Sequence, residues 1–186
     1  MKTYTIIGGV NGVGKSSLTG VLTAKTTELG TIVDVDRITA ELGGDKLKGG
    51  KAAIKKINHC LEIGASFTQE TTLSGARTEH TARRAIDSGY FIRLYYVGVN
   101  DVSESLRRIE NRVRKGGHNI PAEDVRNRYA KRFEDLEKIL PLCNEADFFD
   151  NENGFVEVAE YRNGKLILKG DYRPEWIMQL KKHLEK

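Results

Sequence analysis

The chain has 186 residues, of which 39% are hydrophobic and 30% charged, and its formal net charge is +4. This balance is typical of a soluble globular protein and excludes an intrinsically disordered one, and no apolar run is long enough to cross a membrane. The length suits one domain. Cys60 and Cys143 lie far apart and outside any metal-ligand spacing, so we expect reduced thiols and a cytoplasmic protein.

Apolar β-branched segments alternate with longer amphipathic segments over most of the chain. We expect strands at 3–8, 31–36, 66–70, 90–99 and 147–150, and helices at 17–29, 51–63, 76–87, 101–114 and 122–140. Strands that alternate with helices form a parallel sheet through right-handed crossovers, with helices on both faces. The predicted fold class is therefore α/β, with a mainly parallel sheet between two helical layers.

The pattern changes after Asp150. Two short apolar segments, 155–161 and 165–169, flank Asn163-Gly164, a turn sequence typical of a β-hairpin. Residues 174–185 are expected to form a final helix. We interpret about 153–186 as a hairpin and helix appendage to a single domain, 1–186, whose core covers about 3–152.

Residues 9–16 match the phosphate-binding pattern GxxxxGK[ST] in full, between an apolar strand and a helix. Glycines let backbone N–H groups converge on an anion, and the helix that begins there adds the positive end of its dipole. Lys15 should reach the β- and γ-phosphates, and Ser16 should ligate Mg²⁺. A glycine-rich turn that binds nothing would not explain either residue. The predicted nucleotide-binding residues are Gly9, Asn11, Gly12, Val13, Gly14, Lys15, Ser16 and Ser17.

Two carboxylates follow predicted strands, at the sheet edge where ligands collect in open parallel sheets. Asp36 is the candidate base for phosphoryl transfer to a hydroxyl, and its alternative role is the N-cap of a following helix. Asp34 shares the predicted strand face with Asp36 but lies deeper in the strand. Glu70, Thr72 and Ser74 follow another strand, where they would bind a polar acceptor, hold Mg²⁺ through water, or form a capped turn.

Nine arginines and lysines lie between residues 107 and 132, around a Gly-Gly-His hinge at 116–118. Arg108 and Arg112 share one helix face, and Arg128 and Arg132 share another. Arginines on a mobile segment can close over phosphates, although most of a charged run is solvated surface. We expect about two or three of the nine to contact phosphate. His118 is expected to be a hinge or substrate-contact residue.

The order of these features resembles that of the zeta-toxin-like family of P-loop kinases over roughly residues 3–152, most of all its stand-alone, ABC-type ATPase-like branch. The residues that carry the resemblance are the loop 9–16, Asp36 before Arg37-Ile38, the segment 70–75, Arg108 and Arg112, the segment 116–121, Arg128-Tyr129, and Asp150-Asn151. This ordered series is much more specific than the loop alone.

The resemblance implies an adenylate-kinase-like core, ATP with Mg²⁺, Asp36 as the base, and Arg112 with Arg128 around the phosphates. Arg108 or Arg114 are alternatives to Arg112. The toxins phosphorylate UDP-N-acetylglucosamine, and they carry an acceptor-site arginine where this chain has Ser74. The sequence therefore leaves open which acceptor is phosphorylated and whether an antitoxin-like protein partner exists.

From these features we predict an ATP-dependent kinase acting on a hydroxyl of a small acceptor, with no membrane or nucleic-acid partner. One alternative is a nucleotide-binding ATPase or switch without an acceptor. A GTPase switch would carry an Asn-Lys-x-Asp-type segment, which the sequence lacks. Another alternative is a polynucleotide 5′-kinase, which the positive net charge permits.

Overall fold

The computed structural model describes residues 1–25 and 29–186, and these form a seven-stranded sheet of order β2-β3-β1-β4-β5-β6-β7. The strands are β1 (Thr3–Gly8), β2 (Thr31–Asp34), β3 (Phe67–Thr71), β4 (Phe91–Gly98), β5 (Glu145–Asp150), β6 (Val156–Arg162) and β7 (Lys165–Leu168). The first five strands are parallel, whereas β6 and β7 add antiparallel strands at one edge. The parallel strands thus end at one common edge, where the chain places its polar strand-end residues.

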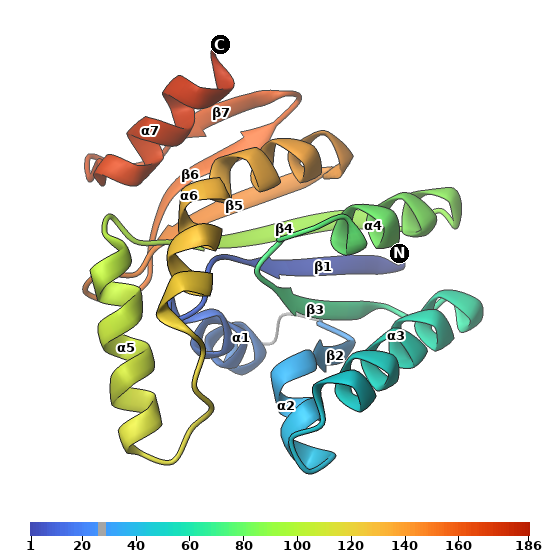
Figure 1. The fold of residues 1–186 in the computed structure, drawn as a ribbon. Coiled ribbons are helices and arrows are strands. Elements are labelled where there is room, and N and C mark those ends of the chain that lie inside the picture. The colour runs from blue at the N-terminus through green and yellow to red at the C-terminus, as the bar shows by residue number, and fades with distance from the viewer. Residues whose placement is uncertain (26–28) are drawn as a thin grey trace.

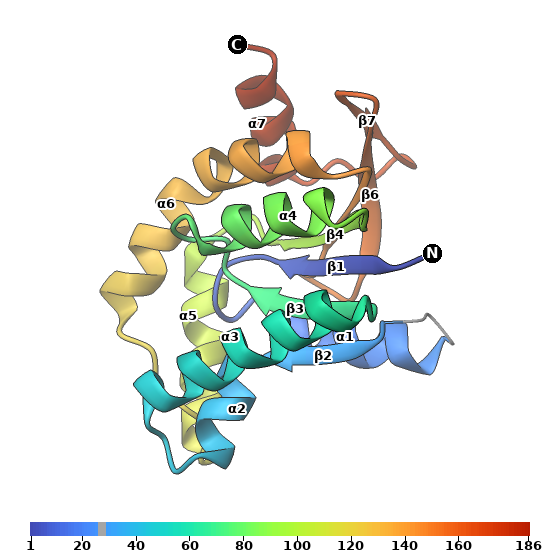
Figure 2. The ribbon, with the colours of Figure 1, turned by 90° about the vertical axis from the view of Figure 1, so that its right-hand side faces the viewer.

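Helices cover both faces of this sheet (Figures 1 and 2). They are α1 (Lys15–Ala24), α2 (Val35–Glu41), α3 (Lys46–Ile63), α4 (Arg77–Asp87), α5 (Val102–Arg114), α6 (Ala122–Ile139) and α7 (Glu175–Leu184), with a 3-10 turn at Leu140–Leu142. Buried residues of α3, α4, α6 and α7 share one apolar cluster on the sheet, and those of α1 belong to a second cluster. The predicted α/β fold class with its terminal hairpin and helix is confirmed.

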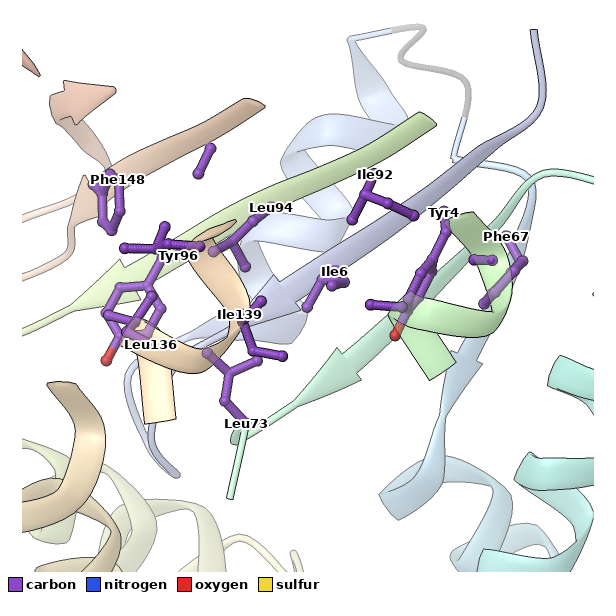
Figure 3. Close-up of a cluster of buried hydrophobic side chains, with 14 of the residues drawn as sticks. Tyr4, Ile6, Phe67, Leu73, Ile92, Leu94, Tyr96, Leu136, Ile139 and Phe148 are labelled. Atoms are coloured by element: carbon purple, nitrogen blue, oxygen red, sulfur yellow. The ribbon is translucent and has the colours of Figure 1, made fainter. Parts of the chain in front are cut away.

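In the larger cluster, aromatic and aliphatic side chains of the central strands pack together with buried residues of α3, α4 and α6 (Figure 3). Tyr4 and Phe67 stack with ring centroids 4.4 Å apart, and both are fully buried. Leu136 and Ile139 close the cluster from α6. Each such side chain contributes about 1.5–3 kcal/mol through burial, so this layer holds the parallel strands in register.

A short helix after the second strand was considered only as an alternative, with Asp36 as its N-cap. β2 ends at Asp34, and α2 follows at once, whereas the apolar, β-branched sequence had suggested a strand to Asp36. The Asp34 side chain accepts hydrogen bonds from the backbone N–H groups of Asp36 (3.0 Å) and Arg37 (3.2 Å). A carboxylate in this position satisfies the first turn of a helix, which explains the early end of the strand.

Two further helices begin earlier than expected. α3 begins at Lys46 rather than residue 51, because Asp45 caps it and Gly49 is tolerated inside it. A Cβ atom on Gly49 would lie 1.9 Å from Thr39 Oγ1, so this glycine lets α2 and α3 pack closely. α1 begins at Lys15 rather than residue 17, and the predicted continuation of this helix through residues 26–28 lies outside the described residues.

The C-terminal segment is part of the core as well as of the sheet. Trp176, Ile177 and Leu180 of α7 are buried in the larger cluster. The Trp176 ring lies directly over Gly98 at the end of β4, where a Cβ atom would come within 2.5 Å of it. Across the described residues, no helix combines the length and the apolar character that a membrane span requires.

Gly98→Ala is expected to destabilise the protein by about 1–3 kcal/mol, because the added methyl group would overlap the buried Trp176 ring. Gly20→Ala in α1 is the matched control, since nothing lies within 4 Å of its Cβ position. That control should stabilise the protein by about 0.5–1 kcal/mol through helix propensity. Urea unfolding measures both, and equal effects of the two substitutions would contradict this packing argument.

Candidate functional site

The phosphate-binding loop connects the end of β1 to α1, and among its enclosed glycines Gly12 and Gly14 have left-handed backbone conformations next to other segments. Gly12 has a φ of 81°, and a Cβ atom there would lie 2.4 Å from the backbone oxygen of Ser105. Gly14 has a φ of 103°, and its Cβ would lie 2.4 Å from the side-chain nitrogen of Asn151. Both conformations are unfavourable for residues with a side chain. The loop is therefore shaped by α5 and by the end of β5.

Lys15 is folded back onto the loop. Its Nζ donates hydrogen bonds to the backbone oxygens of Gly9 (2.9 Å) and Val10 (3.0 Å). Burial lowers the pKa of Lys15 to about 8, and the opposing effect of nearby carboxylates, with Glu70 first, only partly offsets it. The ammonium group is poorly solvated in the free protein. An anionic ligand in the loop would therefore interact with it strongly.

Glu70, at the carboxyl end of β3, bonds to two hydroxyl groups of α1. Ser16 Oγ donates to Glu70 Oε2 at 2.7 Å, and Thr19 Oγ1 donates to Glu70 Oε1 at 2.6 Å. The site thus combines the predicted metal ligand Ser16 with a carboxylate on the neighbouring strand. An all-oxygen set of this kind, beside a phosphate-binding loop, is one that fits Mg²⁺.

Asp34 and Asp36 lie in different settings, which corrects the expectation that they share a strand face. Asp34 caps α2 and is half-buried, so the alternative role considered for Asp36 belongs to Asp34. Asp36 lies in the first turn of α2 and is exposed. Among the described residues, its carboxylate makes no hydrogen bond. Both acidic residues still line the same cavity.

A cavity of about 1070 Å³ collects most of the predicted site residues. From the predicted set, its lining includes Asn11, Gly12, Gly14, Lys15, Ser16, Ser17, Asp36, Glu70, Thr72, Ser74, Arg112 and Arg128. Gly9, Val13 and His118 are not part of the lining. Gly9 and Val13 contribute to the loop from behind, and the His118 backbone oxygen accepts a hydrogen bond from Arg112 (2.9 Å).

The arginines of the basic segment have distinct surroundings. Arg112 is exposed, bonds only to the His118 backbone among the described residues, and lines the cavity. Arg128 is half-buried and donates to Asn11 Oδ1 at 2.6 Å, which connects α6 to the loop. Arg114 pairs with Glu110 on the exposed side of α5 and does not line the cavity. Arg114 is thus a poorer alternative to Arg112.

Arg108 makes hydrogen bonds to three segments of the chain, which its spacing in the sequence did not indicate. Its guanidinium bonds to Glu104 (2.6 Å), to the backbone oxygen of Val13 (3.3 Å), and to the backbone oxygens of Asn151 and Glu152. It therefore joins α5, the phosphate-binding loop and the end of β5. Most of its donors are engaged, so it serves as a support of the loop.

Two other cavity residues were missed as site residues. Asn151 belonged to the family resemblance without a role, and its Nδ2 donates to the backbone oxygen of Val13 at 2.7 Å. Arg77 is the first residue of α4 and also lines the cavity. No motif marks Arg77 in the sequence, because its place depends on how α4 follows the turn after β3.

Solved structures of other proteins share the fold of this chain. One comes from the PezAT chromosomal toxin–antitoxin system of Streptococcus pneumoniae, with a TM-score of 0.67 and 14% identity over 100% of this chain and 86% of that chain. Another is the AvrRxo1-ORF1:-ORF2 complex with ATP, with a TM-score of 0.67 and 15% identity over 100% of this chain and 76% of that chain. This chain has the fold of the zeta-toxin-like P-loop kinases, as the motif series predicted.

A sequence relative places the chain in a family. An uncharacterized protein of Haemophilus influenzae is 30% identical over 126 residues, which cover 65% of this chain and 88% of that protein. The chain belongs to the same family as this Haemophilus influenzae protein. No family model matches the sequence.

The stability of the protein should depend on pH through Lys15. Its pKa of about 8 in the folded chain is below the ordinary value of 10.5, so the unfolded chain binds more protons between these two pH values. The free energy of unfolding of the wild type, relative to Lys15→Gln, should therefore rise with pH above about 8, by at most about 1.4 kcal/mol per pH unit. Urea unfolding from pH 7 to 10 tests this, and a constant difference would contradict the shifted pKa.

Proposed function

We propose that this protein is an ATP- and Mg²⁺-dependent phosphotransferase that transfers the γ-phosphoryl group to a hydroxyl of a small acceptor. The observation that carries this proposal is that one cavity of about 1070 Å³ is lined by both Lys15 and Ser16 and by Asp36. Pockets for one drug-sized ligand typically measure about 300–1,000 Å³. The volume is thus sufficient for a nucleotide and an acceptor together.

The donor half of the reaction is supported by the loop and its neighbours. The phosphates would accept hydrogen bonds from the backbone N–H groups of the loop, and Lys15 would exchange the Gly9 and Val10 oxygens for phosphate oxygens. Mg²⁺ held by Ser16, with Glu70 nearby, would neutralise charge on the β- and γ-phosphates. ATP is the favoured nucleotide because the similar AvrRxo1-ORF1:-ORF2 complex contains it.

The acceptor half is supported by Asp36. An exposed carboxylate without a hydrogen-bond partner among the described residues can accept a proton from an incoming hydroxyl group. Asp34 is less suited, since its Oδ1 already accepts two backbone N–H bonds. Arg112 and Arg128 would neutralise the charge of the transferred group from the other side of the cavity.

A sugar nucleotide such as UDP-N-acetylglucosamine is the first acceptor to test. The hydroxyl side chains of Thr72 and Ser74 line the cavity and suit a sugar. Arg77 lines the same cavity and carries the positive charge that Ser74 lacks, three residues further along the chain. The similarity to toxin–antitoxin structures also makes an antitoxin-like protein partner part of this proposal.

Asp36→Asn is expected to reduce phosphoryl transfer by about 10²–10⁴-fold, because an amide cannot accept the proton. Binding of ATP, measured by calorimetry, should change by less than about twofold, since the phosphates bind elsewhere in the cavity. Asp45→Asn is the matched control, because this carboxylate caps α3 outside the cavity. Full transfer activity in Asp36→Asn would show that the assignment of the base is wrong.

The acceptor class can be tested by transfer of γ-³²P from ATP to UDP-N-acetylglucosamine, to nucleosides and to 5′-hydroxyl oligonucleotides. We expect saturable labelling of the sugar nucleotide, and its loss in Lys15→Ala. Labelling of oligonucleotides alone, with a steep salt dependence, would instead support a polynucleotide kinase. If no acceptor raises ATP turnover above slow hydrolysis, the kinase proposal loses its support.

A further inference from the structure

Asp150 is a buried carboxylate at the end of β5, with 1% of its surface exposed. Its Oδ1 accepts a hydrogen bond from Trp176 Nε1 at 2.8 Å. Its Oδ2 accepts hydrogen bonds from the backbone N–H of Glu152 (3.1 Å) and from the hydroxyl group of Tyr172 (3.3 Å). Burial of an unpaired carboxylate is costly, and these three donors make it tolerable.

The donors come from two separate parts of the chain. Trp176 and Tyr172 belong to the C-terminal segment, whereas Glu152 lies in the connection between β5 and β6. A second link runs parallel to the first, because Asn100 Oδ1 accepts from the Trp176 backbone N–H (3.0 Å) and the Asn100 N–H donates to Glu152 Oε1 (3.2 Å). The C-terminal helix is thus connected twice to the same two-residue segment after β5.

That segment touches the phosphate-binding loop. Asn151 donates to the Val13 oxygen at 2.7 Å, and its amide fills the space beside Gly14. The backbone oxygens of Asn151 and Glu152 also accept hydrogen bonds from Arg108, which in turn bonds to Val13 (3.3 Å). A rotation of residues 151–152 would therefore displace both groups that support the loop, the Asn151 side chain and the Arg108 guanidinium.

We propose that Asp150 is a positioning residue for the nucleotide site, through which Trp176 and Tyr172 hold residues 151–152 against the phosphate-binding loop. This inference rests on the proposed binding of ATP, and it gives the C-terminal segment a role in that binding. Asp150 does not line the cavity and acts through Asn151, so it is not a catalytic residue. The link is polar and directional, so shape-conserving substitutions can break it while the apolar packing stays in place.

Two substitutions interrupt the link. Asp150→Asn conserves the side-chain volume and replaces one acceptor oxygen with an NH₂ group. Trp176→Phe removes the Nε1 donor together with part of the buried indole volume, for which a second truncation in the same helix is the control. Each should raise the Kd for ATP with Mg²⁺ about three- to tenfold by calorimetry, the cost of about one hydrogen bond. The double variant should be no more than about twofold weaker than Asp150→Asn alone, since either change already interrupts the same link from Trp176 to Glu152.

Leu180→Ala is the matched control, because Leu180 is buried in the same helix and has no contact with Asp150 among the hydrogen bonds of the described residues. It should lower the melting temperature and leave the Kd for ATP within about twofold, measured where all variants are folded. An unchanged Kd in Asp150→Asn, or an equal rise in Leu180→Ala, overturns the positioning role. Absence of ATP binding by the wild type would instead overturn the proposed function on which this role depends.

Discussion

The backbone of the phosphate-binding loop is in contact with its neighbours at three glycines. Cβ atoms on Gly9, Gly12 and Gly14 would lie within 2.5 Å of the Val97 oxygen, the Ser105 oxygen and the Asn151 amide, respectively. A loop without side chains at these points can lie between β4, α5 and the end of β5 and still direct its N–H groups outward. The other site residues are arranged around this enclosed loop. Lys15 and Ser16 begin α1 from it, and Arg108 and Asn151 support it from behind.

The close packing of the loop also determines the electrostatics of the ligand-free site. Lys15 is partly buried against the loop, where its ammonium group bonds to backbone oxygens, and burial lowers its pKa. Glu70, Asp36 and Asp34 only partly compensate for this desolvation. The Lys15 ammonium group is thus suited to bind a polyanion, since the anion would replace the solvation that the group has lost. Two carboxylates of the cavity have different surroundings: Glu70 bonds to Ser16 at the end of β3, and Asp36 lies exposed in the first turn of α2.

The antiparallel edge and α7 contribute more than extra surface. Trp176 closes the apolar cluster over Gly98 and also donates to the buried Asp150 carboxylate. The C-terminal residues are therefore linked by hydrogen bonds to the segment after β5. In that segment, the Asn151 side chain bonds to the loop, and the backbone oxygens of residues 151–152 bond to Arg108, which also contacts the loop. The C-terminal helix thus contacts the framework behind the site through Trp176.

Local patterns in the sequence were sufficient for the α/β class, the parallel strands, the hairpin at Asn163-Gly164 and the loop at residues 9–16, because each depends on neighbouring residues or on a contiguous motif. The short helix α2 was considered only as an alternative because the β-branched residues around Asp34 favour a strand, and only the capping hydrogen bonds to Asp34 show where that strand ends. The Asp34 cap is itself a local interaction, over two and three residues, whereas only the tertiary structure placed the exposed Asp36 in the lining of the cavity. Only the tertiary structure, likewise, brought Arg112 into this lining, Arg108 and Asn151 against the loop, and Trp176 against Asp150. These placements depend on contacts between segments far apart in the chain, which arise only when the sheet and its helices pack together.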